Sequence, residues 1–68
     1  MTIQVWINGE TRAVPQGVSL DELVRLLDLP PDRVAIEHNR SVVHRNRWPE
    51  VRLSEADRLE IVQFVGGG

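Results

Sequence analysis

Residues 3–14 of this chain read IQVWINGETRAV, and their pattern indicates how the chain begins to fold. Every second residue from Ile3 to Ile7 is apolar, which is the period of a strand with one buried face. Asn8-Gly9 follows directly, and this dipeptide favours a type I′ turn because both of its positions accept a positive φ. A return strand over residues 10–14 then completes a predicted β-hairpin.

The whole chain has 68 residues, enough for one small domain. It is 41% hydrophobic and 26% charged, which indicates a folded chain rather than a disordered one. It has no cysteine, and this excludes disulfides and thiol-based metal sites. The net charge of −2 is too small to favour a nucleic-acid or membrane partner. There is no long apolar run and no signal-like start, so we expect a cytoplasmic protein.

A helix with a well-defined start follows the hairpin. Ser19 is a good N-cap, and Glu22 three residues later completes the Ser-x-x-Glu pattern of a capping box. Pro30-Pro31 prevents continuation, so we expect the helix over about residues 20–28. The apolar stripe along this helix consists of Leu20, Leu23, Val24 and Leu27.

The remainder of the chain predicts short extended pieces rather than further helices. We expect strands at 34–38, 41–43 and 59–65, a short extended piece at 51–53, turns at 39–40 and 54–57, and an irregular polar segment at 44–49. This order predicts an α+β fold, with a mixed sheet of four to five strands and one helix packed across one face. The predicted sheet residues of the core are Ile3, Val5, Ile7, Val34, Ile36, Leu59 and Ile61.

The last three residues, Gly66, Gly67 and Gly68, stand apart from this folded body over 1–65. Glycines have no side chain to pack and lose the most entropy when ordered, so we expect residues 66–68 to be a flexible tail. Such a tail is thin enough to enter a narrow channel and presents the Gly68 carboxylate away from the body. A carboxylate reacts with nucleophiles only after activation, for example as an acyl adenylate. The alternative interpretation is a frayed end without chemistry.

Several motifs together resemble the ThiS-type sulfur carriers of thiamine biosynthesis. The motifs are the hairpin at 7–10, VAIEHN at 34–39, the pair Val42-Val43, Arg45-x-x-Trp48, DRLEIV at 57–62 and the terminal glycines. The resemblance covers nearly the whole chain and implies a ubiquitin-like β-grasp fold. One position departs from the family pattern, because Ala56 stands where a glycine is frequent before the aspartate. If Ala56 is left-handed, it costs about 1–2 kcal/mol relative to glycine.

The resemblance also implies a mechanism in which the chain is a co-substrate and not an enzyme. A ThiF-type adenylyltransferase would use ATP and Mg²⁺ to adenylate the carboxylate of Gly68, with Gly66 and Gly67 recognised as part of the tail. Sulfur from a cysteine desulfurase persulfide would then displace AMP and leave a thiocarboxylate. A ThiG-type thiazole synthase would receive that sulfur. The carrier itself would bind no cofactor.

Two alternatives stay open. A β-grasp carrier or modifier of another pathway would have the same tail, and molybdopterin synthesis, tRNA thiolation and attachment to protein lysines are examples. A small binding module with inert glycines is an alternative from a different class. Removal of Gly67 and Gly68 separates the last alternative from the others, because only a carrier needs them.

Other side chains suggest partner docking rather than catalysis. Trp6 and Phe64 are expected opposite the core-facing residues of their strands, where they either form an exposed apolar patch or cover one another. For Trp48 the preferred interpretation is that it pins a solvated loop to the body, and partner docking is the alternative.

No catalytic or metal-binding residue is predicted. His38 and His44 match no metal-ligand spacing. The four arginines between positions 40 and 52 are interrupted by Glu50, so we expect a solvated loop and not a nucleic-acid site. There is no nucleophile–base pair and no phosphate-binding loop.

Overall fold

The structure, a computed structural model, describes residues 1–65. The proposed tail at 66–68 therefore lies outside the described residues. In chain order the elements are β1 (Thr2–Ile7), β2 (Glu10–Pro15), α1 (Leu20–Leu26), the 3₁₀ helix η1 (Pro31–Arg33), β3 (Val34–His38), β4 (Ser41–Val43), the 3₁₀ helix η2 (Arg45–Glu50) and β5 (Arg58–Gln63).

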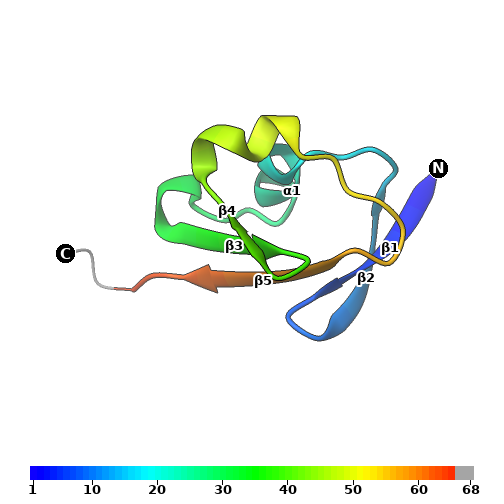
Figure 1. The fold of residues 1–68 in the computed structure, drawn as a ribbon, viewed down its shortest axis with the longest axis horizontal. Coiled ribbons are helices and arrows are strands. Elements are labelled where there is room, and N and C mark those ends of the chain that lie inside the picture. The colour runs from blue at the N-terminus through cyan, green and yellow to red at the C-terminus, as the bar shows by residue number, and fades with distance from the viewer. Residues whose placement is uncertain (66–68) are drawn as a thin grey trace.

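The five strands form one sheet in the order β2-β1-β5-β3-β4. β1 and β5 run parallel, while the pairs β1–β2, β3–β4 and β3–β5 are antiparallel. The predicted mixed sheet with one α-helix is thus confirmed. Figure 1 shows α1 and η2 on the same side of the sheet, above β5 in that view. By the strand order, β5 has two strands on each side. The last strand in the sequence is therefore the central strand of the sheet.

Helix α1 begins as the sequence predicts. The Ser19 hydroxyl accepts the N–H of Glu22, and the Glu22 carboxylate accepts the N–H of Ser19, so the capping box is complete. The helix ends at Leu26, before the expected residue 28, because Asp28 turns into the left-handed region at φ 57°. Among residues 1–65 no helix is long and apolar enough to cross a bilayer.

The core contains most of the predicted residues, but α1 does not cover the sheet alone. The fully buried members include Val5, Ile36 and Leu59 from the sheet and Leu20, Leu23 and Val24 from the helix. Ile3, Ile7, Leu27 and Ile61 are partly buried against them. The segment expected to be irregular forms η2, whose Trp48 is 1% exposed in this core. Its Nε1–H donates to the Val43 carbonyl at 3.0 Å, so the indole is both packed and satisfied.

The short extended piece expected at 51–53 is confirmed, since Val51 has extended backbone at φ −100° and ψ 112° and Arg52 forms an antiparallel bridge with Ser19. The Leu20 N–H donates to the Val51 carbonyl at 3.0 Å, and the Leu53 N–H donates to the Val18 carbonyl at 2.9 Å. Leu53 and Val18 are both buried, so this segment acts as a strap that joins η2 to the start of α1. β5 itself spans Arg58–Gln63, and not 59–65.

Candidate functional site

The candidate site is built around β5, because this strand leads directly to the terminal glycines. Beyond the end of the strand, the Phe64 N–H donates to the Arg33 carbonyl at 2.7 Å. Val65, the last residue that the structure describes, is 94% exposed. Gly66, Gly67 and Gly68, the predicted recognition and modification residues, lie outside the described residues.

Asn8 holds β5 on the side of β1. Backbone pairing between these two strands is short, with only Trp6 opposite Arg58 and Ile7 opposite Leu59. The Asn8 backbone N–H then donates to the Leu59 carbonyl at 2.9 Å. The Asn8 side chain accepts the Ile61 N–H at 2.7 Å and donates to the Ile61 carbonyl at 3.0 Å. The side-chain amide thus extends the ladder as a peptide group would, a role that the sequence pattern of a turn did not reveal.

Asn39 holds β5 on the side of β3, again through both its backbone and its side chain. Its backbone N–H donates to the Arg58 carbonyl at 2.7 Å, and its side-chain Oδ1 accepts the Arg58 N–H at 2.9 Å. Its Nδ2 donates to Asp57 Oδ1 at 3.2 Å. Both hairpin turns therefore fix β5, one near its start and one near its middle.

Asp57 organises the turn that enters β5. Its Oδ2 lies 2.8 Å from His38 Nε2 and accepts the Ser54 N–H at 2.9 Å. Burial of the carboxylate raises the pKa of Asp57, but the hydrogen bonds from His38, Ser54 and Asn39 outweigh it, so the net pKa lies below its ordinary value of 3.8. His38 thus has a carboxylate partner and a structural position.

Ala56, next to Asp57, has a φ of 71°. The position is therefore left-handed, which is the condition under which we expected alanine to be strained relative to glycine. The Ala56 N–H donates to the Gln4 carbonyl at 2.7 Å, so the strained residue is held against β1. Within residues 1–65 no group of three or more histidine, cysteine or acidic side chains is arranged to hold a metal ion.

The three docking candidates are not brought together. Trp48 is buried and hydrogen-bonded to the Val43 carbonyl, so the preferred interpretation that it pins its segment to the body is confirmed. The alternative that its ring is a docking surface is wrong. Trp6 lies under the Arg58 guanidinium, 4.9 Å from the ring centroid. Phe64 is six residues beyond Arg58, or about 20 Å along an extended chain. Trp6 and Phe64 therefore neither cover one another nor form a single patch.

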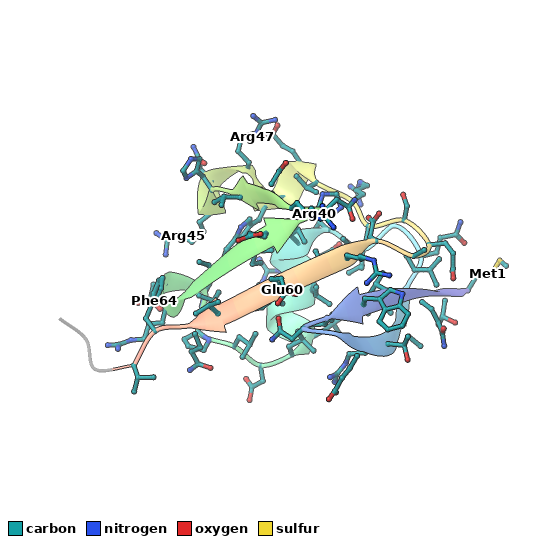
Figure 2. All side chains as sticks on the ribbon, turned by 60° about the horizontal axis from the view of Figure 1, so that its bottom comes forward. Met1, Arg40, Arg45, Arg47, Glu60 and Phe64 are labelled. Carbon is teal, nitrogen blue, oxygen red and sulfur yellow. The ribbon has the colours of Figure 1, made fainter. Side chains whose placement is uncertain are left out.

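Phe64 stays an exposed apolar side chain, at 56% exposure. Val62 and Val42, at 57% and 64% exposure, line one hollow on the sheet and form an apolar group that the sequence pattern did not predict. Val62 pairs with Ala35 on the face of the sheet opposite α1. Figure 2 looks onto this face, with Glu60 in the middle of β5 and Phe64 near its end. The alternation of apolar and polar residues along a strand did not reveal this group. The alternation shows which residues lie on the outer face of the sheet, but it does not show which residues of different strands are neighbours there.

A hollow of about 590 Å³ lies beside the start of α1, and its charged side chains are engaged in local structural contacts. The backbone N–H of Ser19, and then its hydroxyl, lower the pKa of the lining residue Glu22 through the capping box. Arg25 pairs with the carboxylate one turn earlier at 3.0 Å, and Arg52 donates to the Gly17 carbonyl at 2.9 Å. These charged groups are used to hold the helix start in place.

Comparison with known proteins gives concordant results. The ThiS family model matches residues 5–68. The chain is 38% identical over 66 residues to a thiazole synthase of Magnetococcus marinus, covering 97% of this chain and 20% of that protein. It is 36% identical over 50 residues to the sulfur carrier protein ThiS of Bacillus subtilis, covering 74% of this chain and 76% of that one.

A similar solved structure is the crystal structure of the thiamine biosynthesis protein ThiS from Geobacter metallireducens, with a TM-score of 0.83 and 25% sequence identity. The superposition covers 97% of this chain and all of that one. The chain thus spans nearly the whole of this structure but about a fifth of the matched thiazole synthase.

Proposed function

Because the chain belongs to the ThiS family of sulfur carriers of thiamine biosynthesis, we propose that it carries sulfur on the carboxylate of Gly68. The observation that carries the proposal is that the family match runs through the last glycine, over residues 5–68. The body over 1–65 supplies the support, since β5 is bound on both flanks and leads directly to these glycines.

The chemistry proceeds on the tail and is performed by partners. A ThiF-type adenylyltransferase with ATP and Mg²⁺ joins the Gly68 carboxylate to AMP and releases pyrophosphate. The terminal sulfur of a cysteine desulfurase persulfide displaces AMP. Cleavage of the resulting S–S bond by a thiol leaves the thiocarboxylate. The carrier is a co-substrate in each step, with Gly66 and Gly67 as the part that enters the partner's channel, and we place these steps in the cytoplasm.

A ThiG-type thiazole synthase is the proposed acceptor of the sulfur. Two relatives named thiazole synthase, from Magnetococcus marinus and Paramagnetospirillum magneticum, contain a segment similar to nearly this whole chain. A carrier-like segment in the same polypeptide as a thiazole synthase favours this acceptor over those of molybdopterin synthesis or tRNA thiolation.

The test uses the purified carrier with the ThiF-type enzyme of the same host. We expect ATP–pyrophosphate exchange with the full chain and none with a variant lacking Gly67 and Gly68. Thermal melting of the two proteins should agree, because glycines have no side chain to contribute to a core. Exchange at the full rate without the two glycines would overturn the proposal.

A second measurement locates the sulfur. Intact-mass analysis of the carrier isolated from its host should reveal a species heavier by the exchange of one oxygen for one sulfur, with the difference confined to the C-terminal peptide. Recovery of the chain joined to lysines of other proteins would instead indicate a protein modifier.

A further inference from the structure

The outer face of the sheet contains a small hollow with an unusual combination of groups. The hollow has a volume of about 80 Å³ and lies between β4, β3 and β5. Its lining residues are Ala35, Ile36, Glu37, Val42, Glu60 and Val62. It thus combines apolar side chains with two carboxylates.

The two carboxylates stand directly opposite each other. Glu37 pairs with Glu60 in the antiparallel register of β3 and β5, and both are exposed. Like charges at directly opposed positions destabilise a sheet. Neither glutamate forms an ion pair with any residue in the described range 1–65. The nearest cation along the same face of β5, Arg58, is stacked on Trp6.

The volume of the hollow and the charge of its two glutamates indicate which kind of group can bind there. A hollow of about 80 Å³ holds the end of one side chain and is too small for a metabolite. A guanidinium presents several N–H donors in a planar fork, so one arginine can bind two carboxylates at once. The apolar groups Val42 and Val62 then pack against the stem of that arginine and its neighbours.

We propose that this hollow is the docking site for an arginine of the partner enzyme that adenylates the tail, with apolar side chains of that partner around it. The inference rests on the proposed function, since it assumes that an enzyme acts on the glycines. From Glu60, β5 passes Val62 and ends at Gln63. Phe64, the next residue, lies near this end of the strand (Figure 2). A partner anchored at the hollow is therefore positioned beside the emerging tail.

The site is a protein-docking site rather than a metal site. Two carboxylates alone do not complete the coordination of Mg²⁺ or Ca²⁺. Residues 1–65 bring no third acidic or histidine side chain to this pair. The charge repulsion between Glu37 and Glu60 is instead relieved when a cation from the partner arrives, so the pair favours the complex over the free carrier.

The test measures steady-state ATP–pyrophosphate exchange with the activating enzyme as a function of carrier concentration. The double variant Glu37→Gln and Glu60→Gln keeps the shape of the hollow and removes its charge. We expect its KM to rise about tenfold while kcat stays within about twofold of the wild type, because docking and not the tail is affected. The wild-type KM should also rise with salt more steeply than that of the variant.

A matched control keeps the comparison specific. Glu10→Gln removes one exposed charge at the start of β2, away from the hollow, and should leave KM unchanged. The melting temperature of the double variant should be equal to or above that of the wild type, since a repulsion is removed.

The outcomes separate the two proposals. Exchange by the wild type with an unchanged KM in the double variant, or a loss of kcat in place of a rise in KM, overturns the docking site and leaves the carrier function intact. Absence of exchange with the wild-type chain overturns the carrier function, and the docking site falls with it.

Discussion

The two hairpin turns of this protein both begin with a left-handed asparagine that binds β5, but they differ in the residue that follows. Asn8 and Asn39 both adopt a left-handed conformation, at φ 51° and 50°, and both use the side-chain amide to bind the backbone of β5. The second turn position differs, because Gly9 has φ 84° and Arg40 has φ 75°. The first turn has a glycine where a positive φ is required, whereas the second turn has a residue that is strained there.

The two turns also differ in how much backbone pairing lies beside their contacts with β5. β1 and β5 share two backbone register pairs, so Asn8 supplies much of what joins them. β3 and β5 share five pairs, so Asn39 adds to a ladder that is already long. The strands that each turn itself joins show the reverse order, with six register pairs between β1 and β2 and three between β3 and β4. Ladder length therefore bears on the two asparagine contacts with β5 and does not explain why Arg40 stands at the second turn.

The comparison predicts that the first asparagine matters more for stability. Asn8→Ala removes both side-chain bonds to Ile61 and leaves alanine left-handed, so we expect a loss of about 3 kcal/mol in the free energy of unfolding. Asn39→Ala should cost less, about 2 kcal/mol, because five backbone pairs remain. Urea denaturation of both variants measures this order. A larger loss at Asn39 would contradict the argument from ladder length.

The second turn alone is tied to a titrating group, through Asp57. The pKa of Asp57 lies below 3.8, so its contribution to stability is present above pH 3.8 and is lost as the pH falls through the lower folded-state pKa. We expect Asp57→Asn to cost about 2 kcal/mol at neutral pH. The difference from the wild type should shrink below pH 3.8, as followed by denaturation over a pH series. A constant difference at all pH values would exclude this linkage.

Exchange of the second turn residues tests the strain directly. An added Cβ at Gly9 meets nothing within 4 Å, so Gly9→Arg should cost only the backbone strain, about 1 kcal/mol. Arg40→Gly should stabilise by about 0.5–1 kcal/mol, reduced by the greater freedom of glycine in the unfolded chain. Melting curves of the two single variants should move in opposite directions. Destabilisation by both changes would mean that Arg40 makes a compensating contact.

The smallest expected effect lies at Ala56, a left-handed residue in the turn that enters β5. Ala56→Gly should raise the free energy of unfolding by about 0.5 kcal/mol, because the φ of 71° is easier for glycine while the unfolded chain gains freedom. A matched control is Ala13→Gly in strand β2, which should be destabilising. Equal signs for the two changes would argue against strain at Ala56.

Where one local feature determines the structure, the sequence was sufficient to predict it. Asn8-Gly9 specified the first hairpin, and Ser19 with Glu22 specified the start of α1, since both depend on neighbours within a few residues. The period of the apolar residues placed Val5, Ile36 and Leu59 correctly in the core. The mixed sheet followed from the order of these elements.

Features that depend on long-range contacts were not predicted. The polar sequence around Trp48 does not exclude partner docking, yet η2 folds its ring into the core and onto the Val43 carbonyl. The bonds from Asn8 and Asn39 to β5 span 53 and 19 residues, and no local pattern reveals them. The pairing of Glu37 with Glu60 likewise depends on the register of two strands distant in sequence.

The central position of β5 has a mechanical consequence. An enzyme that draws the glycines into a channel pulls on β5 along its own axis, while β1 and β3 grip both sides of that strand. Under such a load the flanking hydrogen bonds are sheared together and do not open one after another from an end. The sheet over residues 1–65 should therefore resist unfolding when the chain is pulled from its C-terminal end.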